Sequence, residues 1–420
     1  MKFAQALGAA ALASLASIAT ASSPILAQYW PAYNAEQQSV SQIPWTYSSK
    51  NGIAYYFVTI TTKDGFEVPA DQPTSDIKKF VSAAKANGVR PVFSVGGWDG
   101  SLHFSDLVKT ASKQATFAEQ IKSFMDKYGF VGVDLDWEYP NGVGIGCNAV
   151  SGDDSAHLLA FLKVLRSKIG SSKLITAAVS TEGFLGANGK ALSSFKPYGQ
   201  YLDYINLMTY DIAGSWSSTT GPNSPLRKCS SDSSVQTAIK LWTSRGFPAS
   251  KILLGVPAYA ISFTTKSSSL QTTKINNKWS SKAYQPWTGV VPKGAPGDSN
   301  APTTDVCGTK TAAYSGQWQF KDLVSNGLVS SDGMHGKNGY KRYFDECSQA
   351  PFLFNPSKKH YISYEDSRSV AVKTVYAKQQ GLGGVFVFDS AGFTNEVYSS
   401  LRSSLYSRKS RRHELPALHA

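Results

Sequence analysis

Apolar and polar positions alternate along this chain in two patterns. Short runs rich in β-branched and aromatic residues are separated by longer segments in which apolar residues recur at helical spacing. The short runs predict buried strands and the longer segments amphipathic helices. Helices are predicted over residues 75–87, 113–128 and 154–169, each followed by a glycine of the kind that commonly ends a helix. Strands are predicted at residues 26–33, 53–60, 90–97, 131–139, 174–181, 204–210, 252–259 and 384–388.

Eight strands that alternate with helices predict an α/β fold, and in a single chain of this size they predict a (β/α)8 TIM barrel. The interval 264–359 breaks this pattern, because it is rich in Ser, Thr, Gly, Pro and aromatic residues. A structureless loop of that length is uncommon, so the interval predicts a small α+β insertion domain. The catalytic barrel is then expected to comprise residues 22–263 and 360–403.

The two ends of the chain differ in composition from the region between them. Residues 1–21 have a charged start, an Ala/Leu-rich middle and the small residues Ala19-Thr20-Ala21, which is the pattern of a secretory signal peptide. We therefore expect a secreted, extracellular protein that begins near Ser22, and no later stretch is long enough for a membrane span. Residues 404–420 predict a basic, disordered tail.

The cysteines are Cys147, Cys229, Cys307 and Cys347, and in an exported chain they suggest two disulfides. Their positions favour pairing Cys147 with Cys229 and Cys307 with Cys347. All three possible pairings remain open from the sequence.

The formal charge of +13 raises the question of an acidic partner. A nucleic-acid site gathers its basic residues in a patch or stripe. Here they are scattered except between Arg402 and Arg412 in the tail. We therefore expect a monomer with no nucleic-acid or membrane partner, and 42% hydrophobic residues supply a large core.

Residues 132–139, GVDLDWEY, carry the strongest chemical signal. Side chains alternate faces along a strand, so Asp134, Asp136 and Glu138 share one face. Carboxylates roughly 6 to 7 Å apart in a partly buried row cannot all ionise comfortably, so one should keep a proton near neutral pH. A protonated carboxyl beside ionised ones is suited to protonating the leaving oxygen of a sugar linkage. The row therefore predicts a hydrolase site.

Two other interpretations compete for this row. Acidic residues on alternate strand positions can bind a hard cation, or they can be the solvent face of an edge strand. The apolar opposite face and the preceding helix argue against an edge strand. The six histidines form no ligand spacing, so we expect neither a metal nor another cofactor.

Three further motifs occur in order with the acid row at the expected strand ends. They are Ser94-Val95-Gly96-Gly97-Trp98, Met208-Thr209-Tyr210-Asp211 and Tyr259-Ala260-Ile261-Ser262-Phe263. With these motifs the chain resembles the family 18 glycoside hydrolases of the chitinase type over nearly its whole mature length. The expected substrates are chitin and chitooligosaccharides.

The resemblance implies a substrate-assisted retaining mechanism. Glu138 is then the general acid and base, and the nucleophile is the substrate's own 2-acetamido oxygen. Asp136 orients the acetamido N–H, and Asp134 shares a proton with Asp136 deeper in the barrel. Tyr210 holds the acetamido oxygen.

The resemblance also implies a set of substrate contacts. Asp211 binds sugar in the cleft, Tyr259 lies in a strand-end motif, and Met208, Tyr29 and Phe57 line the innermost subsite. Barrel packing is an equally good interpretation of Tyr29 and Phe57. Trp98 and Trp216 lie just past strand ends, where an exposed ring can stack on a pyranose. Gly96 and Gly97 allow close backbone approach beside the acid row.

The chain departs from the family pattern at three positions. Val131 stands where the acidic motif usually opens with another Asp, Ile261 where an Arg commonly follows Tyr259 by two residues, and Phe388 where a Trp usually floors the innermost site. Phe388 retains an aromatic floor with less stacking area. These departures affect subsite preference and rate more than reaction type.

Two rival functions share this fold. A chitin-binding lectin binds without cutting, and such members typically lack the acid that Glu138 supplies here. An endo-β-N-acetylglucosaminidase acting on N-linked glycans would use the same chemistry. The aromatic-rich insertion and Trp98 favour a polymer groove over a branched-glycan pocket.

Overall fold

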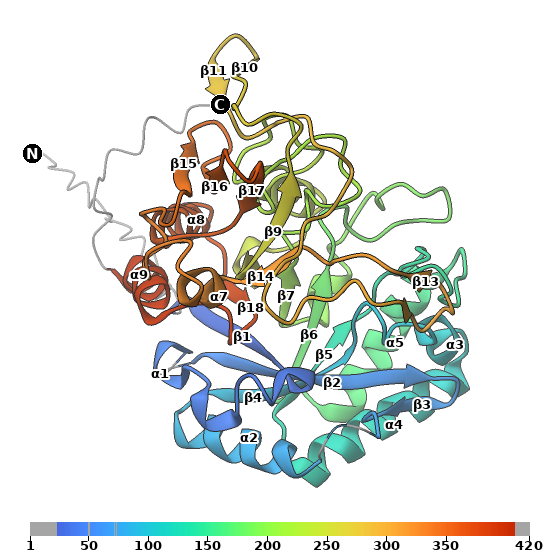
Figure 1. The fold of residues 1–420 in the computed structure, drawn as a ribbon. Helices are drawn as coiled ribbons and strands as arrows, with labels where there is room; N and C mark the ends of the chain where they lie inside the picture. The colour runs from blue at the N-terminus through green and yellow to red at the C-terminus, as the bar shows by residue number, and fades with distance from the viewer. Residues whose placement is uncertain (1–22, 49–50, 71, 73, 408–420) are drawn as a thin grey trace, which may run out of the picture.

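The computed structural model describes residues 23–48, 51–70, 72 and 74–407. The expected signal peptide and the expected start near Ser22 lie outside these residues, as does the tail from residue 408 onward. Within them the chain forms a barrel that carries an insertion domain at one end of its strands (Figure 1).

Eight parallel strands close the barrel in the order β1-β18-β8-β7-β6-β5-β4-β2, and β1 pairs with β2 to complete the circle. Each strand overlaps a predicted one, so the predicted TIM barrel is confirmed. Their bounds are β1 (Ile25–Pro31), β2 (Ile53–Thr62), β4 (Arg90–Gly96), β5 (Gly132–Asp136), β6 (Leu174–Val179), β7 (Tyr204–Leu207), β8 (Ile252–Pro257) and β18 (Gly384–Phe388). A short strand, β3 (Gly65–Glu67), pairs antiparallel with the end of β2.

Helices cover the outside of the barrel. They are α1 (Trp45–Ser48), α2 (Ser75–Ala86), α3 (Phe104–Val108), α4 (Ala111–Tyr128), α5 (Asp154–Ile169), α6 (Val235–Ser244), α8 (Ser367–Gln379) and α9 (Asn395–Tyr406), with 3-10 turns at Ala32–Asn34, Val40–Gln42, Tyr198–Gln200 and Ala249–Lys251. The described residues 180–203 between β6 and β7 contain no α-helix, because glycines at 183, 186, 189 and 199 and Pro197 interrupt the segment. Helix α9 continues through Tyr406, into the segment expected to be tail.

The barrel strands bury both of their faces. Residues such as Val133 and Leu135 pack outward against the helices. Inside the barrel a separate apolar cluster includes Tyr29, Tyr55 and Phe386. Strands buried on two sides are expected of a parallel barrel and explain their almost continuous apolar runs.

The insertion is built on a five-stranded antiparallel sheet in the order β14-β9-β17-β16-β15. Its strands β9 (Tyr259–Thr264) and β17 (His360–Ser363) begin and end the excursion, so the sheet includes residues on both sides of the expected boundaries. The remaining elements are β14 (Gln317–Gln319), α7 (Phe320–Ser325), β15 (Lys341–Asp345), β16 (Ala350–Asn355) and the hairpins β10 (Thr273–Ile275) with β11 (Trp279–Ser281) and β12 (Thr303–Thr304) with β13 (Lys310–Thr311). A core of its own, including Phe263, Phe352 and Tyr361, supports this sheet.

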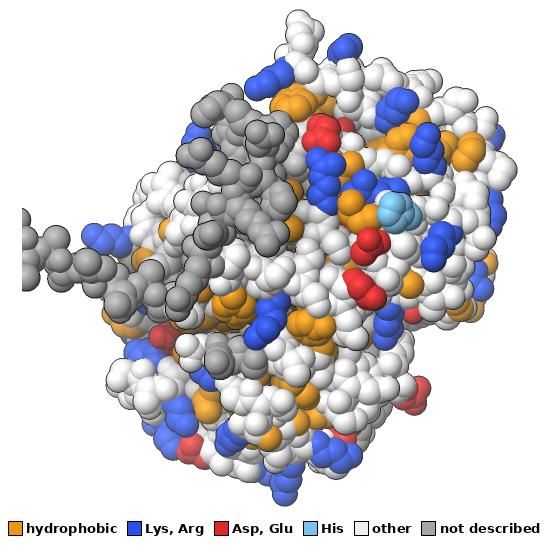
Figure 2. Space-filling view, turned by 90° about the vertical axis from the view of Figure 1, so that its left-hand side faces the viewer, with side chains coloured by type: hydrophobic (Ala, Val, Ile, Leu, Met, Phe, Trp, Pro, Cys, Tyr) orange, Lys and Arg blue, Asp and Glu red, His pale blue; other side chains and the backbone are white. Residues whose placement is uncertain are grey.

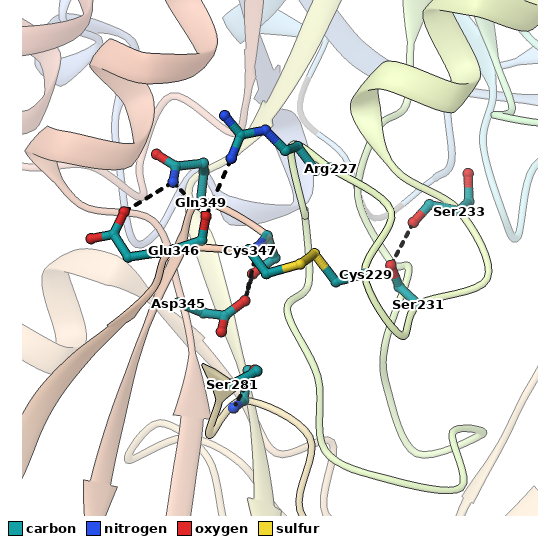
Figure 3. Close-up of a disulfide and its surroundings, with 11 residues drawn as sticks. Arg227, Cys229, Ser231, Ser233, Ser281, Asp345, Glu346, Cys347 and Gln349 are labelled. Atoms are coloured by element: carbon teal, nitrogen blue, oxygen red, sulfur yellow. Dashed lines mark hydrogen bonds between the residues drawn. A yellow bond between two sulfur atoms is a disulfide. The ribbon is translucent and has the colours of Figure 1, made fainter. Parts of the chain in front are cut away.

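Two disulfides join the insertion to the barrel. Cys147 pairs with Cys307 at a Cα–Cα distance of 5.6 Å, and Cys229 pairs with Cys347 at 6.1 Å (Figure 3). The pairing favoured from the sequence is therefore wrong. Nearness along the chain was misleading, because the insertion folds back over the barrel and brings each of its two cysteines against a barrel loop, one after β5 and one after β7.

Charged side chains are dispersed on the face shown in Figure 2. Lys and Arg side chains lie among neutral ones and do not gather in a single patch there. None of the helices in the described part of the chain combines the length and apolar character needed to cross a membrane.

Candidate active site

Strand β5 delivers the three acidic side chains to the end of the barrel. Asp134 and Asp136 are buried and Glu138 is partly buried. The intervening residues face the other way, and Trp137 stacks on Phe104 with ring centroids 5.2 Å apart. The predicted alternation along this strand is therefore present in the structure.

Asp134 is the innermost carboxylate and is surrounded by hydrogen-bond donors. Its Oδ2 accepts from the hydroxyls of Tyr29 at 2.8 Å and Ser94 at 2.7 Å. Its Oδ1 accepts from the Thr176 hydroxyl at 2.6 Å and the Asn206 amide at 3.2 Å. Burial raises the pKa of Asp134, and these four hydrogen bonds act in the opposite direction. Donors on both oxygens favour the ionised form.

Asp136 and Glu138 lie in a different environment. Burial and the neighbouring carboxylates of Glu138 and Asp134 raise the pKa of Asp136. Burial raises the pKa of Glu138 to about 7, opposed by a hydrogen bond with the Tyr139 side chain. None of the ion pairs formed by the described residues includes a carboxylate of this row. A proton shared near neutral pH is the expected consequence.

The expected sharing of a proton between Asp134 and Asp136 is not visible as a contact. In the described part of the chain no hydrogen bond joins the two carboxyls, and the buried Oδ1 of Asp136 has no partner. The electrostatic coupling of Asp136 is strongest with Glu138. Asp136 is thus coupled to both of its neighbours in the row, and more strongly to Glu138 than to Asp134.

An aromatic cluster forms the floor beside the acids. The ring of Phe388 lies 5.7 Å from Tyr29, 6.5 Å from Phe57, 6.1 Å from Tyr210 and 6.4 Å from Tyr259. Phe388, Phe57 and Tyr210 are partly exposed, whereas Tyr29 is 2% exposed. Tyr29 therefore lies beneath the floor and contacts Asp134, which favours the packing interpretation for this residue.

The other candidate substrate contacts lie around this floor. Met208 packs at the edge of the barrel interior. Tyr259 donates to Oδ1 of Asp211 at 2.6 Å, which links the start of β9 to the segment after β7. Trp98 is 48% exposed and Trp216 is 66% exposed, so both rings are available to a ligand.

Gly97 shows why this loop carries glycine. Its φ is +89°, and a Cβ placed there would lie 2.2 Å from Cζ of Phe57. Its backbone N–H donates to the carbonyl of Asp136 at 2.8 Å. Glycine thus lets the loop after β4 approach both the acid row and the aromatic floor, as predicted.

Sequence reasoning missed several side chains that shape the site. Tyr33 follows β1, is 56% exposed and lies 6.2 Å from the Phe57 ring. Ser101 and Asn148 bind the backbone around Glu138. Thr176 and Asn206 could have been found, because each is a polar residue inside an apolar strand run. No comparable signal marks Ser101 or Asn148.

The three departures from the family pattern occupy different places. Val131 is partly buried just before β5, and its N–H donates to the Pro91 carbonyl at 2.9 Å. Ile261 is 5% exposed inside the core of the insertion. Phe388 alone of the three belongs to the floor described above. In the described residues no group of three or more His, Cys, Asp or Glu side chains could hold a metal ion.

Comparisons with known proteins agree with this geometry. Residues 25–392 match glycosyl hydrolases family 18. A chitinase-like effector of Moniliophthora roreri is 35% identical over 394 residues, which are 91% of this chain and 93% of that protein. Chitinase A1 of Niallia circulans is 30% identical over 346 residues, which are 78% of this chain and 44% of that protein.

The fold gives the same relationship. The crystal structure of a chitinase from Rhizomucor miehei aligns with a TM-score of 0.79 and 28% identity, covering 90% of this chain and 99% of that one. On the family match and the architecture together, this chain belongs to family 18 of the glycosyl hydrolases.

Proposed function

We propose that this protein is a secreted chitinase that hydrolyses the β-1,4 linkages between N-acetylglucosamine units with retention of configuration. The observation that carries the proposal is the setting of Glu138. Its carboxyl stands at the end of β5 near Asp136, and burial raises its pKa to about 7. Such a carboxyl keeps its proton to near neutral pH and can give it to a leaving oxygen. The names of the relatives supply the substrate.

In the first step Glu138 donates its proton to the glycosidic oxygen. As the bond from the anomeric carbon to that oxygen breaks, the acetamido oxygen of the same sugar forms a bond to the anomeric carbon and closes an oxazolinium ring. The Asp136 carboxylate accepts a hydrogen bond from the acetamido N–H and balances the positive charge that develops on the ring. The nucleophile is already held on the substrate, and well-oriented intramolecular cases reach effective molarities of about 10⁵ M or more.

In the second step water opens the ring. The ionised Glu138 takes a proton from the water as the water oxygen attacks the anomeric carbon. The bond between the anomeric carbon and the acetamido oxygen breaks, and the acetamido group is restored. Glu138 thereby regains its proton for the next cycle. Two displacements at one carbon leave the product in the β configuration.

The remaining cleft residues are assigned to binding. Phe388, Phe57 and Met208 would contact the innermost sugar, with Tyr210 directing its hydroxyl to the acetamido oxygen and Asp211, held by Tyr259, binding sugar nearby. The exposed rings of Trp98 and Trp216 would extend the groove along the polymer, because flat apolar faces stack on pyranoses. The signal-like sequence of residues 1–21 supports secretion.

A second candidate is a protein that binds chitin without cleaving it. It is favoured by the relative from Moniliophthora roreri, which is named a chitinase-like effector, and by the substitutions at Val131, Ile261 and Phe388. Against it, all three carboxylates of the row are present.

The test is product analysis of a soluble N-acetylglucosamine hexamer incubated with the protein and with its Glu138→Gln variant. The wild type should release short oligomers whose new reducing ends are initially β. The variant should lose at least about 10²- to 10⁴-fold in turnover, the usual contribution of a general acid, while binding is retained. Products from both proteins would remove Glu138 from its role. If neither protein releases products and both bind chitin measurably, the second candidate function, binding without cleavage, is favoured.

A further inference from the structure

The backbone of Glu138 lies beyond the regular pairing of its strand. The last residue of β5 paired with β4 is Asp136, and the last paired with β6 is Leu135. Side chains from two loops take over from there. The Ser101 hydroxyl donates to the Asp136 carbonyl at 2.9 Å and accepts from the Glu138 N–H at 3.0 Å, and Asn148 Nδ2 donates to the Glu138 carbonyl at 2.8 Å.

The contact from Asn148 requires a close approach by its own loop, residues 140–153. Gly144 has φ of +50°, and a Cβ there would lie 2.1 Å from the Glu138 carbonyl oxygen and 2.5 Å from Asn148 Nδ2. Glycine at this position therefore leaves the space in which the amide reaches the carbonyl. The loop has no helix or strand of its own between β5 and α5.

A covalent bond fixes this loop next to Asn148. The neighbouring residue, Cys147, is joined to Cys307 at the tip of a long arm of the insertion, residues 289–316. In Figure 1 the arm crosses from the insertion to the side of the barrel where α3 and α5 lie, and it carries β13 there.

The arm is organised locally at its base and its tip. At the base the Asp298 carboxylate accepts from the N–H groups of Gly294 at 2.7 Å and of Ser315 and Gly316 at 3.0 Å. At the tip Asp305 accepts from the N–H groups of Cys307 at 2.9 Å and Thr309 at 2.8 Å. Most residues between the two ends are exposed. The disulfide is thus the firm connection between the arm and the barrel loop.

We propose that Asn148 is a positioning residue for Glu138 and that the Cys147–Cys307 disulfide keeps it in place, so that the insertion arm helps to set the geometry of the acid. This inference rests on the proposed role of Glu138. The N–H of Ala149, next to Asn148, donates to the Leu102 carbonyl at 2.8 Å, so removing the tether loosens this part of the loop without releasing it. The hydrogen bond from Asn148, the only side-chain donor to the Glu138 carbonyl among the described residues, is then weakened. The carboxyl gains freedom to turn toward water.

Movement of the Glu138 carboxyl toward water should change its pKa in a definite direction. Greater contact with water reduces the burial that raises the pKa of Glu138, so its pKa should fall. The neighbouring acidic groups remain in place and are common to every variant. They are Asp136 on β5, Tyr139 after it, Asp99 after β4, Tyr210 and Asp211 after β7, and Tyr33 after β1.

The chain offers a matched control in its other disulfide. Cys229–Cys347 also ties the insertion to the barrel, but its surroundings are the insertion sheet and the loop after β7 (Figure 3). There the Asp345 carboxylate accepts from the Ser348 N–H at 2.8 Å and its hydroxyl at 2.6 Å, and Arg227 donates to the Glu346 carbonyl at 3.3 Å. No residue of this group contacts Glu138.

The experiment compares wild type, Cys147→Ser/Cys307→Ser, Cys229→Ser/Cys347→Ser and Asn148→Leu. Turnover of the N-acetylglucosamine hexamer is measured with the titration of Glu138, followed by carbon-13 NMR of labelled glutamate carboxyls and assigned with Glu138→Gln. The first double variant and Asn148→Leu should lose about 10- to 100-fold in kcat with a smaller change in KM, as expected of a misplaced group. Their Glu138 pKa should fall by about half a unit or more. The control pair should match the wild type.

The control variant also permits a reversible test. In Cys229→Ser/Cys347→Ser the sole remaining disulfide is Cys147–Cys307, so reduction should lower kcat and reoxidation should restore it. An unchanged kcat and titration in Asn148→Leu, or equal losses in the two disulfide variants, would overturn the proposal. If the wild type does not cleave the hexamer, the proposed function fails, and the carboxyl titration still decides whether the tether positions Glu138.

Discussion

Buried carboxylates gather in two regions of this molecule, and the regions differ in what faces them. At the end of β5, Asp136 and Glu138 face each other and further acidic groups. Before α8, the buried Glu365 accepts from Lys373, and Asp366 accepts from Arg342 Nε at 2.8 Å. Burial raises the carboxyl pKa in both regions, but the second cluster has cations that lower it again.

The paired cluster before α8 stabilises the structure, whereas the acid row is suited to proton transfer. Arg342 lies on β15 of the insertion and Asp366 caps α8, so their ion pair fastens the insertion to the barrel. Each carboxylate of this cluster is held by a cation, which opposes the rise in pKa that burial causes. The acid row has unpaired carboxyls and a pKa near 7, the property that proton transfer requires.

The largest effect is expected when the paired cluster is broken. Lys373→Met leaves Glu365 buried without its cation, so the free energy of unfolding should fall by about 3–5 kcal/mol. Both side chains are almost fully buried, at 0% and 2% exposure, so water cannot replace the lost partner. Urea unfolding of the variant measures the loss, while hexamer turnover per folded molecule should stay unchanged.

The matched control removes both charges. Lys373→Met/Glu365→Leu should recover most of the stability, because replacing a buried pair by apolar groups is often neutral or favourable. If Lys373→Met alone is as stable as the wild type, the buried pair of Lys373 with Glu365 does not stabilise the fold and its structural role is refuted.

The contrast between the clusters also explains what could be predicted from the sequence. The acid row was predictable because strand alternation is local, and three acids in an apolar run are conspicuous. Lys373 and Glu365 are eight positions apart on either side of a helix start, and nothing in their neighbours marks them as buried. Their burial depends on how α8 packs against α9 and β18.

Features of the fold that depend on local sequence were also predictable, and features that depend on tertiary contacts were not. The eight strands were predictable from their runs of apolar residues, and the glycines and Pro197 after β6 are local signals against a helix there. The disulfide pairing was not predictable, because it depends on tertiary placement: Cys307 reaches Cys147 only because the arm crosses the barrel. Ser101 and Asn148 were missed for the same reason, because loops far apart in the sequence meet at Glu138.

A smaller effect is expected within the acid row itself. Asp134→Asn should lower the free energy of unfolding by about 2–3 kcal/mol, because an amide nitrogen would face hydroxyl donors that need an acceptor. Asp136→Asn should cost little or stabilise the protein, since Oδ1 of Asp136 has no partner among the described residues. Urea unfolding of both variants at one pH compares them directly.

Both variants change one carboxylate of the same strand to an isosteric amide, so each serves as the other's control. Equal losses would mean that the hydrogen bonds around Asp134 do not distinguish it from Asp136. A larger loss at Asp136 would contradict the stabilising role of the hydrogen bonds around Asp134.

The smallest effect is a gain in stability when the acid is removed. The pKa of Glu138 in the folded protein is about 7, above its ordinary value of 4.5. The stability that this group contributes is therefore fully present below about pH 4.5 and is lost as the pH rises through about 7. Glutamine stays neutral, so Glu138→Gln should be more stable than the wild type at pH 8 by about 1–2 kcal/mol, allowing for partial solvent contact.

Urea unfolding at pH 4 and pH 8 tests this sign, and the two proteins should unfold alike at the lower pH. The same titration should control catalysis, because the first step needs the protonated carboxyl. Above about pH 7, kcat/KM of the wild type should fall tenfold per pH unit as that proton is lost. The stability difference between the two proteins should appear near pH 7, and kcat/KM of the wild type should fall near the same pH. If kcat/KM falls at a clearly different pH, the proton donor is a group other than Glu138.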